Sequence, residues 1–204
     1  MKMFRFGEMQ FDVLKEVGNI GAGNAATALS KLISKEIDML VPLVKIVGFD
    51  DIAEFVGGAE NVVVSVYLRI IGDVPGNMFF IMSIESAKSL IKQMMGIEPS
   101  EHGFSEMEIS ALSEIGNILI GSYLTSLADF TNLNMQPSVP SLAIDMAGAI
   151  LSFGLIEMGQ LGDYALAIDT VFLEDKELVE GHFFLLPDPE SLEKVFSALG
   201  VPVE

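Results

Sequence analysis

The sequence contains no cysteine, and basic residues are scarce. Without cysteine, neither a disulfide framework nor a thiol nucleophile is available, and the chain fits a reducing compartment. Eleven Lys and Arg stand against 29 Asp and Glu, which gives a formal net charge of -18. A surface with this charge repels a phosphate backbone, so nucleic acids and anionic membranes are poor partners. The excess of acid either serves solubility or favours a basic partner surface.

Long uncharged apolar runs are also missing. The two longest apolar stretches, 62–71 and 142–156, are interrupted by Arg69 and Asp145. Neither therefore offers the roughly 18 uncharged residues that a membrane helix needs. At the N-terminus, Glu8 comes before any apolar core of a signal peptide could develop. We therefore predict a cytoplasmic protein without a membrane span.

Several common catalytic patterns are absent as well. The only two histidines, His102 and His182, do not lie in a cluster with ligand spacing, and no nucleophile elbow or H-E-x-x-H motif occurs. We expect both to be ordinary surface or strand residues. The segment 18–26 contains a G-x-G-x-x-A string, but helical periodicity precedes it where a dinucleotide fingerprint requires a strand. We therefore reject a nucleotide site there.

What the sequence does contain is an internal repeat. The segments 12–20 and 110–118 align without a gap, and 79–96 resembles 183–200. Repeats of this kind indicate two copies of one structural unit. The chain of 204 residues, half of them hydrophobic, is long enough for one sizeable core or for two half-domains that share one. The linker 96–103 is too short to suggest independent domains.

We therefore predict a single domain over 1–204, with repeat one at about 8–97 and repeat two at about 104–204. Helical spacing of apolar residues predicts long helices over 10–34 and 106–131. Short helices are expected at 85–95 and 189–199. Apolar runs bounded by turn residues predict strands at 37–48, 61–72 and 77–84, and near 141–153, 163–173 and 180–187. The predicted fold class is α/β (α+β), with one mostly antiparallel six-stranded sheet, helices packed on it, and pseudo-two-fold symmetry.

Each long helix carries the same polar stripe. Asp12, Glu16 and Asn19 fall within roughly 60° of one another on one helix face. Ser110, Glu114 and Asn117 repeat this arrangement. A solvated face tolerates many polar residues interchangeably, and Asn is a poor choice inside a helix because its side chain competes for the backbone. The recurrence of Glu and Asn at the same spacing therefore favours a function that needs the carboxylate and the amide.

Small residues continue the stripe in both helices. Gly23 and Thr27 follow in the first copy, and Gly121 and Thr125 follow in the second. Glycine inside a helix costs about 1 kcal/mol relative to alanine. Small residues here indicate either room for a partner to approach the backbone or packing of the helices against this protein's own core.

The two motifs, Asp12-x3-Glu16-x2-Asn19-x22-Pro42 and Ser110-x3-Glu114-x2-Asn117-x22-Pro140, resemble those of the CheC/CheX/FliY family of bacterial chemotaxis phosphatases. The resemblance covers essentially the whole chain. Two complete motifs distinguish the chain from CheX, which has one, and we expect no additional flagellar-switch domain of the FliY kind. The resemblance implies hydrolysis of the aspartyl phosphate of the response regulator CheY.

The resemblance also implies roles for the motif residues. Asn19 and Asn117 would orient the attacking water, and Glu16 and Glu114 would anchor the receiver. Asp12 and Ser110 would support docking from one turn away. Pro42 and Pro140 would fix the path of the chain into the sheet.

The same resemblance implies partners and alternatives. The receiver would bring its own Mg²⁺, so no cofactor of the chain's own is expected. CheD would be a second partner, with Asp145 and Met146 as the expected contact; an ordinary strand or helix with an edge-facing Asp is the alternative there. A non-catalytic adaptor that binds phosphorylated CheY or CheD, and a flagellar-switch component, are the rival functions.

Overall fold

The computed structural model describes residues 8–41, 43–48, 51–100, 103–158, 164–174, 177–188 and 190–200. Two long helices of 26 residues each dominate it, α1 (Glu8–Ile33) and α4 (Glu106–Thr131). The strands are β1 (Asp38–Leu40), β2 (Val44–Gly48), β3 (Val62–Gly72), β4 (Gly76–Ser83), β5 (Met135–Pro137), β6 (Ser141–Met146), β7 (Tyr164–Glu174) and β8 (Glu177–Pro187). The shorter helices are α2 (Ile52–Phe55), α3 (Ile84–Met95), α5 (Ala147–Met158) and α6 (Ser191–Ala198).

All eight strands join one antiparallel sheet in the order β1-β7-β8-β4-β3-β5, with β2 also on β7 and β6 also on β3. When β1–β4 are exchanged with β5–β8, the same strand order is obtained in the reverse direction, as pseudo-two-fold symmetry requires. The first strands of each half pair with the third strand of the other half. The two repeats are thus interlocked through backbone hydrogen bonds.

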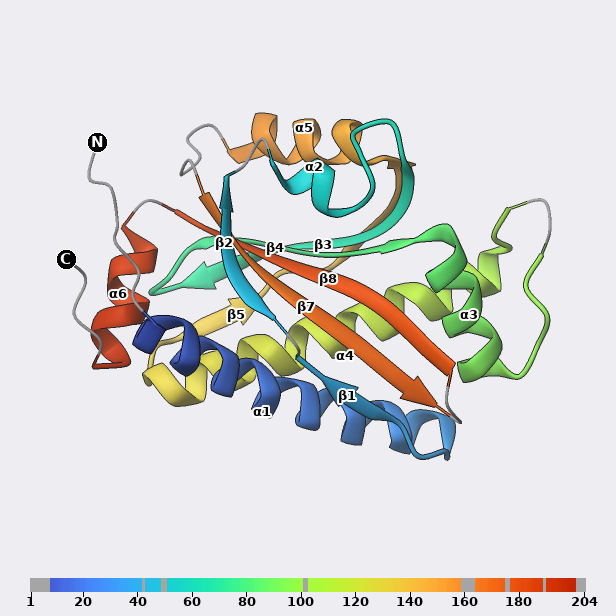
Figure 1. The fold of residues 1–204 in the computed structure, drawn as a ribbon, viewed down its shortest axis with the longest axis horizontal. Helices are drawn as coiled ribbons and strands as arrows, with labels where there is room; N and C mark the ends of the chain where they lie inside the picture. The colour runs from blue at the N-terminus through green and yellow to red at the C-terminus, as the bar shows by residue number, and fades with distance from the viewer. Residues whose placement is uncertain are drawn as a thin grey trace.

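Helices cover both faces of this sheet (Figure 1). α1 and α4 run antiparallel across one face, α2 and α5 lie over the other, and α3 and α6 stand at the two ends. A large core fills the space between α1, α4 and the sheet, and a second, smaller core lies beneath α2 and α5. The alternation of side chains along each strand supplies apolar residues to both cores.

The predicted fold class is confirmed: an α+β protein with a mostly antiparallel sheet and two long helices packed together. The described residues form an eight-stranded sheet where we expected six strands: the run 37–48 is divided into β1 and β2, and β5 is an additional strand that precedes the one expected near 141–153. In the second half, Pro137 and Pro140 flank the break between β5 and β6. Proline has no backbone N–H and cannot continue a ladder. At the break, the Ser138 amide donates to the Arg69 carbonyl at 2.8 Å.

The expected strand near 141–153 is correct only as far as Met146. From Ala147 the chain is the helix α5. This segment is apolar on every side, so the sequence shows no helical periodicity to separate a buried helix from a strand. The amides of Ala147 and Gly148 donate to the carbonyls of Asn61 and Ala59, which ties the start of α5 to the loop before β3.

The long helices cross at Gly21. A Cβ atom at this position would lie 3.1 Å from the Tyr123 Cα atom, a tight contact that glycine avoids. The Tyr123 hydroxyl lies 3.2 Å from Thr170 Oγ1, and burial raises the pKa of Tyr123 well above its usual value. None of the helices in the described part of the chain is both long and apolar enough to cross a membrane.

α4 begins with a capping box. The Ser105 hydroxyl oxygen accepts a hydrogen bond from the backbone N–H of Glu108 at 3.3 Å. The Glu108 carboxylate accepts hydrogen bonds from the backbone N–H groups of Ser105 and Ser100. These hydrogen bonds favour the charged carboxylate and lower the pKa of Glu108 below its usual range. The start of the helix that carries the second motif is therefore fixed locally.

Candidate functional site

The first motif lies on the outer face of α1. Asp12 and Glu16 are exposed, and Asn19 is half-buried. The opposite side of the helix, which includes Leu14 and Val17, is buried against the sheet. The structure therefore presents the predicted carboxylate and amide together at the surface, as one continuous strip.

The side chain of Asn19 has a fixed orientation. The backbone N–H of Val41 donates to Asn19 Oδ1 at 3.2 Å, and Val41 itself is only 2% exposed. An amide oxygen has two lone pairs, so one remains for another donor, and no described residue accepts a hydrogen bond from the NH₂ group. Val41 immediately precedes Pro42, the last residue of the motif. The 22 residues between Asn19 and Pro42 therefore return the chain to the side-chain amide of Asn19.

The second motif matches the first in exposure and differs in this contact. Ser110 and Glu114 are exposed and Asn117 is half-buried. Among the residues that the structure describes, none makes a hydrogen bond with the Asn117 side chain. Val139, the counterpart of Val41, is 89% exposed. The two sites therefore have the same residues at the same helical positions, but only the first amide is held by the main chain.

The small residues divide into an inner and an outer set. Gly21 and Gly116 pack inward: a Cβ atom at Gly21 would make a tight contact with Tyr123, and one at Gly116 would collide with Val66. Gly23 and Gly121 face outward, and nothing lies within 4 Å of the position where a Cβ atom would stand. Packing within the protein therefore explains the inner glycines and leaves the outer ones unexplained.

Gly23 lines an open groove beside the first site. A depression of about 500 Å³ runs between the C-terminal half of α1 and residues 36–39. Gly23, Thr27 and Ser30 line it from the helix. Thr27 donates its hydroxyl to the Gly23 carbonyl at 2.9 Å, and Ser30 accepts the amide of Ile37. On α4, Thr125 is exposed beside Gly121.

The remaining predicted residues lie elsewhere. Pro42 is outside the described residues, as is His102, and Pro140 lies between β5 and β6. Asp145 and Met146 are exposed at the junction of β6 and α5, far along the chain from both motifs. His182 is a strand residue on β8 whose Nδ1 atom lies 2.8 Å from Asp169 Oδ1. The G-x-G-x-x-A string lies in the middle of α1, so no free helix N-terminus is present for a phosphate.

Sequence reasoning missed the contribution of the Val41 backbone. Side-chain motifs do not report main-chain donors. Pro42 was the available signal for this contact. The residue before a proline is biased to an extended conformation, so Val41 was expected to lie outside a helix, where its backbone N–H needs another acceptor.

Comparisons with known proteins agree with this arrangement. The family model described as CheC-like family matches residues 9–46 and 107–144, the two motif regions. A relative from Bacillus subtilis strain 168, named CheY-P phosphatase CheC, is 46% identical over 198 residues, which cover 95% of each chain. A relative from Halobacterium salinarum, named putative CheY-P phosphatase CheC1, is 26% identical over 93% of this chain and 96% of its own.

A solved structure extends the comparison to the fold. The crystal structure of Thermotoga maritima FliY matches with a TM-score of 0.74 at 19% identity, over 96% of this chain and 98% of that chain. The duplicated Glu and Asn helices of this chain and its one antiparallel sheet place it in the class of internally duplicated α+β proteins. Within that class, this chain belongs to the CheC-like family.

Proposed function

We propose that this chain is a phosphatase that hydrolyses the aspartyl phosphate of the response regulator CheY. The observation that carries the proposal is the exposed Glu and Asn pair, present twice on equivalent helix faces. One turn further along each helix lies an outward-facing glycine, Gly23 or Gly121, with nothing within 4 Å of the position of a Cβ atom. The relative at 46% identity, named CheY-P phosphatase CheC, supports the same reaction.

The catalytic role falls to Asn19 and Asn117. A phosphorylated receiver holds a Mg²⁺ ion and a Lys at its phosphoryl group, so hydrolysis lacks only a water in line with the scissile bond. An amide inserted beside the phosphoryl group accepts a hydrogen bond from this water through its carbonyl oxygen and donates one to a phosphoryl oxygen through its NH₂ group. The amide supplies orientation without acting as a base.

Glu16 and Glu114 anchor the receiver. A free carboxylate aimed at a phosphoryl group would repel it, so the productive partner is a basic side chain of the receiver. Asp12 and Ser110 add contacts one turn earlier. The net charge of -18 favours encounter with a basic surface.

Truncating the anchor separates docking from chemistry. In a chain whose other site is inactivated by Asn→Ala, we expect Glu16→Ala or Glu114→Ala to raise the receiver concentration that gives half-maximal dephosphorylation by about tenfold, the effect of one charge-assisted hydrogen bond. Glu54→Ala, which removes an exposed carboxylate on the opposite side of the sheet, is the matched control. An equal effect of Glu54→Ala would mean that the contribution is net charge and not a contact.

The rival function is an adaptor that binds phosphorylated CheY without catalysis. Phosphate release from a receiver charged with acetyl phosphate, followed with and without this chain, separates the two. The phosphatase predicts a rate that rises and saturates with chain concentration. An adaptor predicts saturable binding with an unchanged rate of phosphate loss.

CheD is the second proposed partner, with the junction of β6 and α5 as its contact. Met146 is 45% exposed there and Asp145 lies beside it. An apolar side chain next to a carboxylate suits a partner surface with a similar mixture. Met146→Lys should abolish co-purification with CheD and leave dephosphorylation unchanged; retained binding would place the contact elsewhere.

A further inference from the structure

A second cavity lies on the opposite side of the sheet from the two motifs. It has a volume of about 330 Å³ and is enclosed by β3, β4, β6 and α5. The register explains its floor: Ser65 pairs with Ala143 and Tyr67 with Ser141, so these side chains share one face of the sheet. The volume is at the lower end of the range of sites that hold small organic ligands.

The floor of this cavity contains a buried hydroxyl without a partner. Ser65 is 1% exposed, and its Oγ atom makes no hydrogen bond with any residue that the structure describes. Buried polar atoms are almost always hydrogen-bonded, because leaving one unpaired costs free energy. Apolar residues of similar size would fill this position at lower cost. The hydroxyl therefore needs an external partner to be satisfied.

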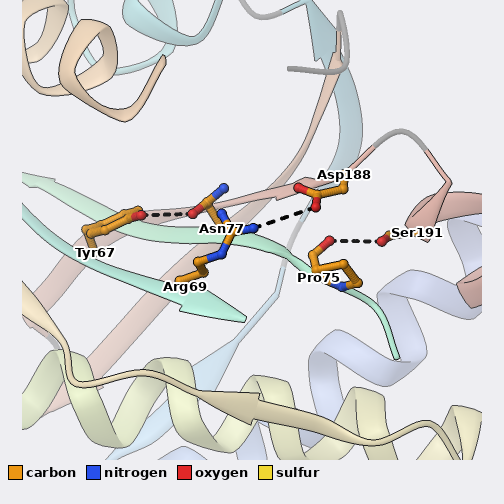
Figure 2. Close-up of polar contacts among 6 residues, drawn as sticks. All are labelled: Tyr67, Arg69, Pro75, Asn77, Asp188 and Ser191. Carbon is orange, nitrogen blue, oxygen red and sulfur yellow. Dashed lines mark hydrogen bonds and ion pairs between the residues drawn. The ribbon is translucent and has the colours of Figure 1, made fainter. Parts of the chain in front are cut away.

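A polar contact behind the floor fixes one wall. The Tyr67 hydroxyl donates to Asn77 Oδ1 at 2.8 Å, as Figure 2 shows, while Asn77 is completely buried. This bond holds the ring of Tyr67 against Phe79, with the two ring centroids 4.9 Å apart. The cavity thus has an aromatic wall, and Ala149 and Ile150 of α5 supply an apolar wall on the other side.

The rim carries a carboxylate without a basic partner. Asp145 is exposed and lines the cavity. One of its oxygens, Oδ1, accepts the amide of Met146 at 2.8 Å. No Lys, Arg or His of the described residues forms an ion pair with Asp145. Its second oxygen is therefore free to accept a hydrogen bond from a cation.

These features together select one class of ligand, and we infer that the cavity binds a small organic ammonium ion with an apolar or aromatic body. An anion would be repelled by Asp145 and by the net charge of -18. A pure hydrocarbon would leave the Ser65 hydroxyl unpaired. An ammonium group donates up to three hydrogen bonds, and its body packs against the aromatic wall. This inference does not depend on the phosphatase proposal.

Titration of the full chain with benzylamine tests the inference. We expect saturable binding, measured by calorimetry, with NMR shifts confined to residues around the cavity. Benzyl alcohol, which has the same shape without the charge, should bind about tenfold more weakly. Asp145→Asn keeps the acceptor for the Met146 amide and removes the charge, so it should weaken benzylamine binding by about tenfold.

A matched pair of serine variants separates binding from folding. Ser65→Ala removes an unpaired hydroxyl, so it should leave the unfolding temperature unchanged or higher while it weakens benzylamine binding. Ser126 is equally buried, but its hydroxyl donates to the Ser122 carbonyl at 2.9 Å and accepts from Asn24. Ser126→Ala should lower the unfolding temperature and leave benzylamine binding unchanged. Equal affinities for benzylamine and benzyl alcohol, no effect of Asp145→Asn, or no saturable binding would each overturn the inference.

Discussion

At the scale of single residues, the side-chain amides of the two motifs differ in their surroundings. Asn19→Ala leaves the buried amide of Val41 without its acceptor, which should lower the free energy of unfolding by about 1–3 kcal/mol. Asn117→Ala removes no hydrogen bond made by a described residue and should change it by less than about 0.5 kcal/mol. Urea unfolding measures both values, and hydrogen exchange at the Val41 amide should accelerate only in Asn19→Ala. Equal losses of stability would contradict the difference between the sites.

The outer glycines make a second prediction at this scale. Gly23→Ala meets no neighbouring atom, so it should raise the free energy of unfolding by up to about 1 kcal/mol through helix propensity alone. If the receiver approaches the backbone there, the same change should weaken receiver binding. Gly116→Ala is the contrasting variant, because a Cβ atom would collide with Val66, and it should destabilise the protein by about 1–3 kcal/mol. A stabilised Gly23→Ala variant with full receiver affinity would remove the outer glycine from the docking surface.

At the scale of elements, the start of α4 should respond to pH. The pKa of Glu108 is lower in the folded chain than in the unfolded chain, so its stabilising contribution is present above the unfolded value and is lost as the pH falls through the folded value. Glu108→Gln keeps a side chain that fits a capping box but cannot ionise. The difference in unfolding temperature between wild type and Glu108→Gln should therefore shrink between pH 6 and pH 3. A difference independent of pH would show that the charge contributes nothing.

The elements also show where prediction from the sequence succeeds. The helices α1 and α4 could be located to within about two residues, because their apolar positions follow one face of a helix. The site motifs followed from those helices, because residues four and seven positions apart share a face. α5 could not be predicted, since its sequence is apolar on every side of the helix and shows no periodicity. The Val41 contact and the Ser65 cavity depend on chain segments that meet only in the folded protein.

At the scale of the whole molecule, the exchange of strands between repeats determines how the protein folds. β1 and β2 have their sheet partner in β7, and β5 and β6 have theirs in β3. Neither half can complete its own sheet. We therefore propose that the chain is a single domain, and we expect 8–97 and 104–204, produced separately, to lack cooperative thermal unfolding. Mixing them should restore it, as circular dichroism would detect. Cooperative unfolding of either half alone would show two independent domains.

The central claim is that the two amides orient the attacking water, and the rate of CheY dephosphorylation tests it most directly. The variant with both Asn19→Ala and Asn117→Ala should bind phosphorylated CheY and leave its phosphate to decay at the rate of CheY alone. The variant with Asp at both positions retains an acceptor for the Val41 amide and controls for the loss of stability, and it should be equally inactive because a carboxylate cannot donate to the phosphoryl group. Wild-type rates in either double variant, with binding retained, would contradict the account.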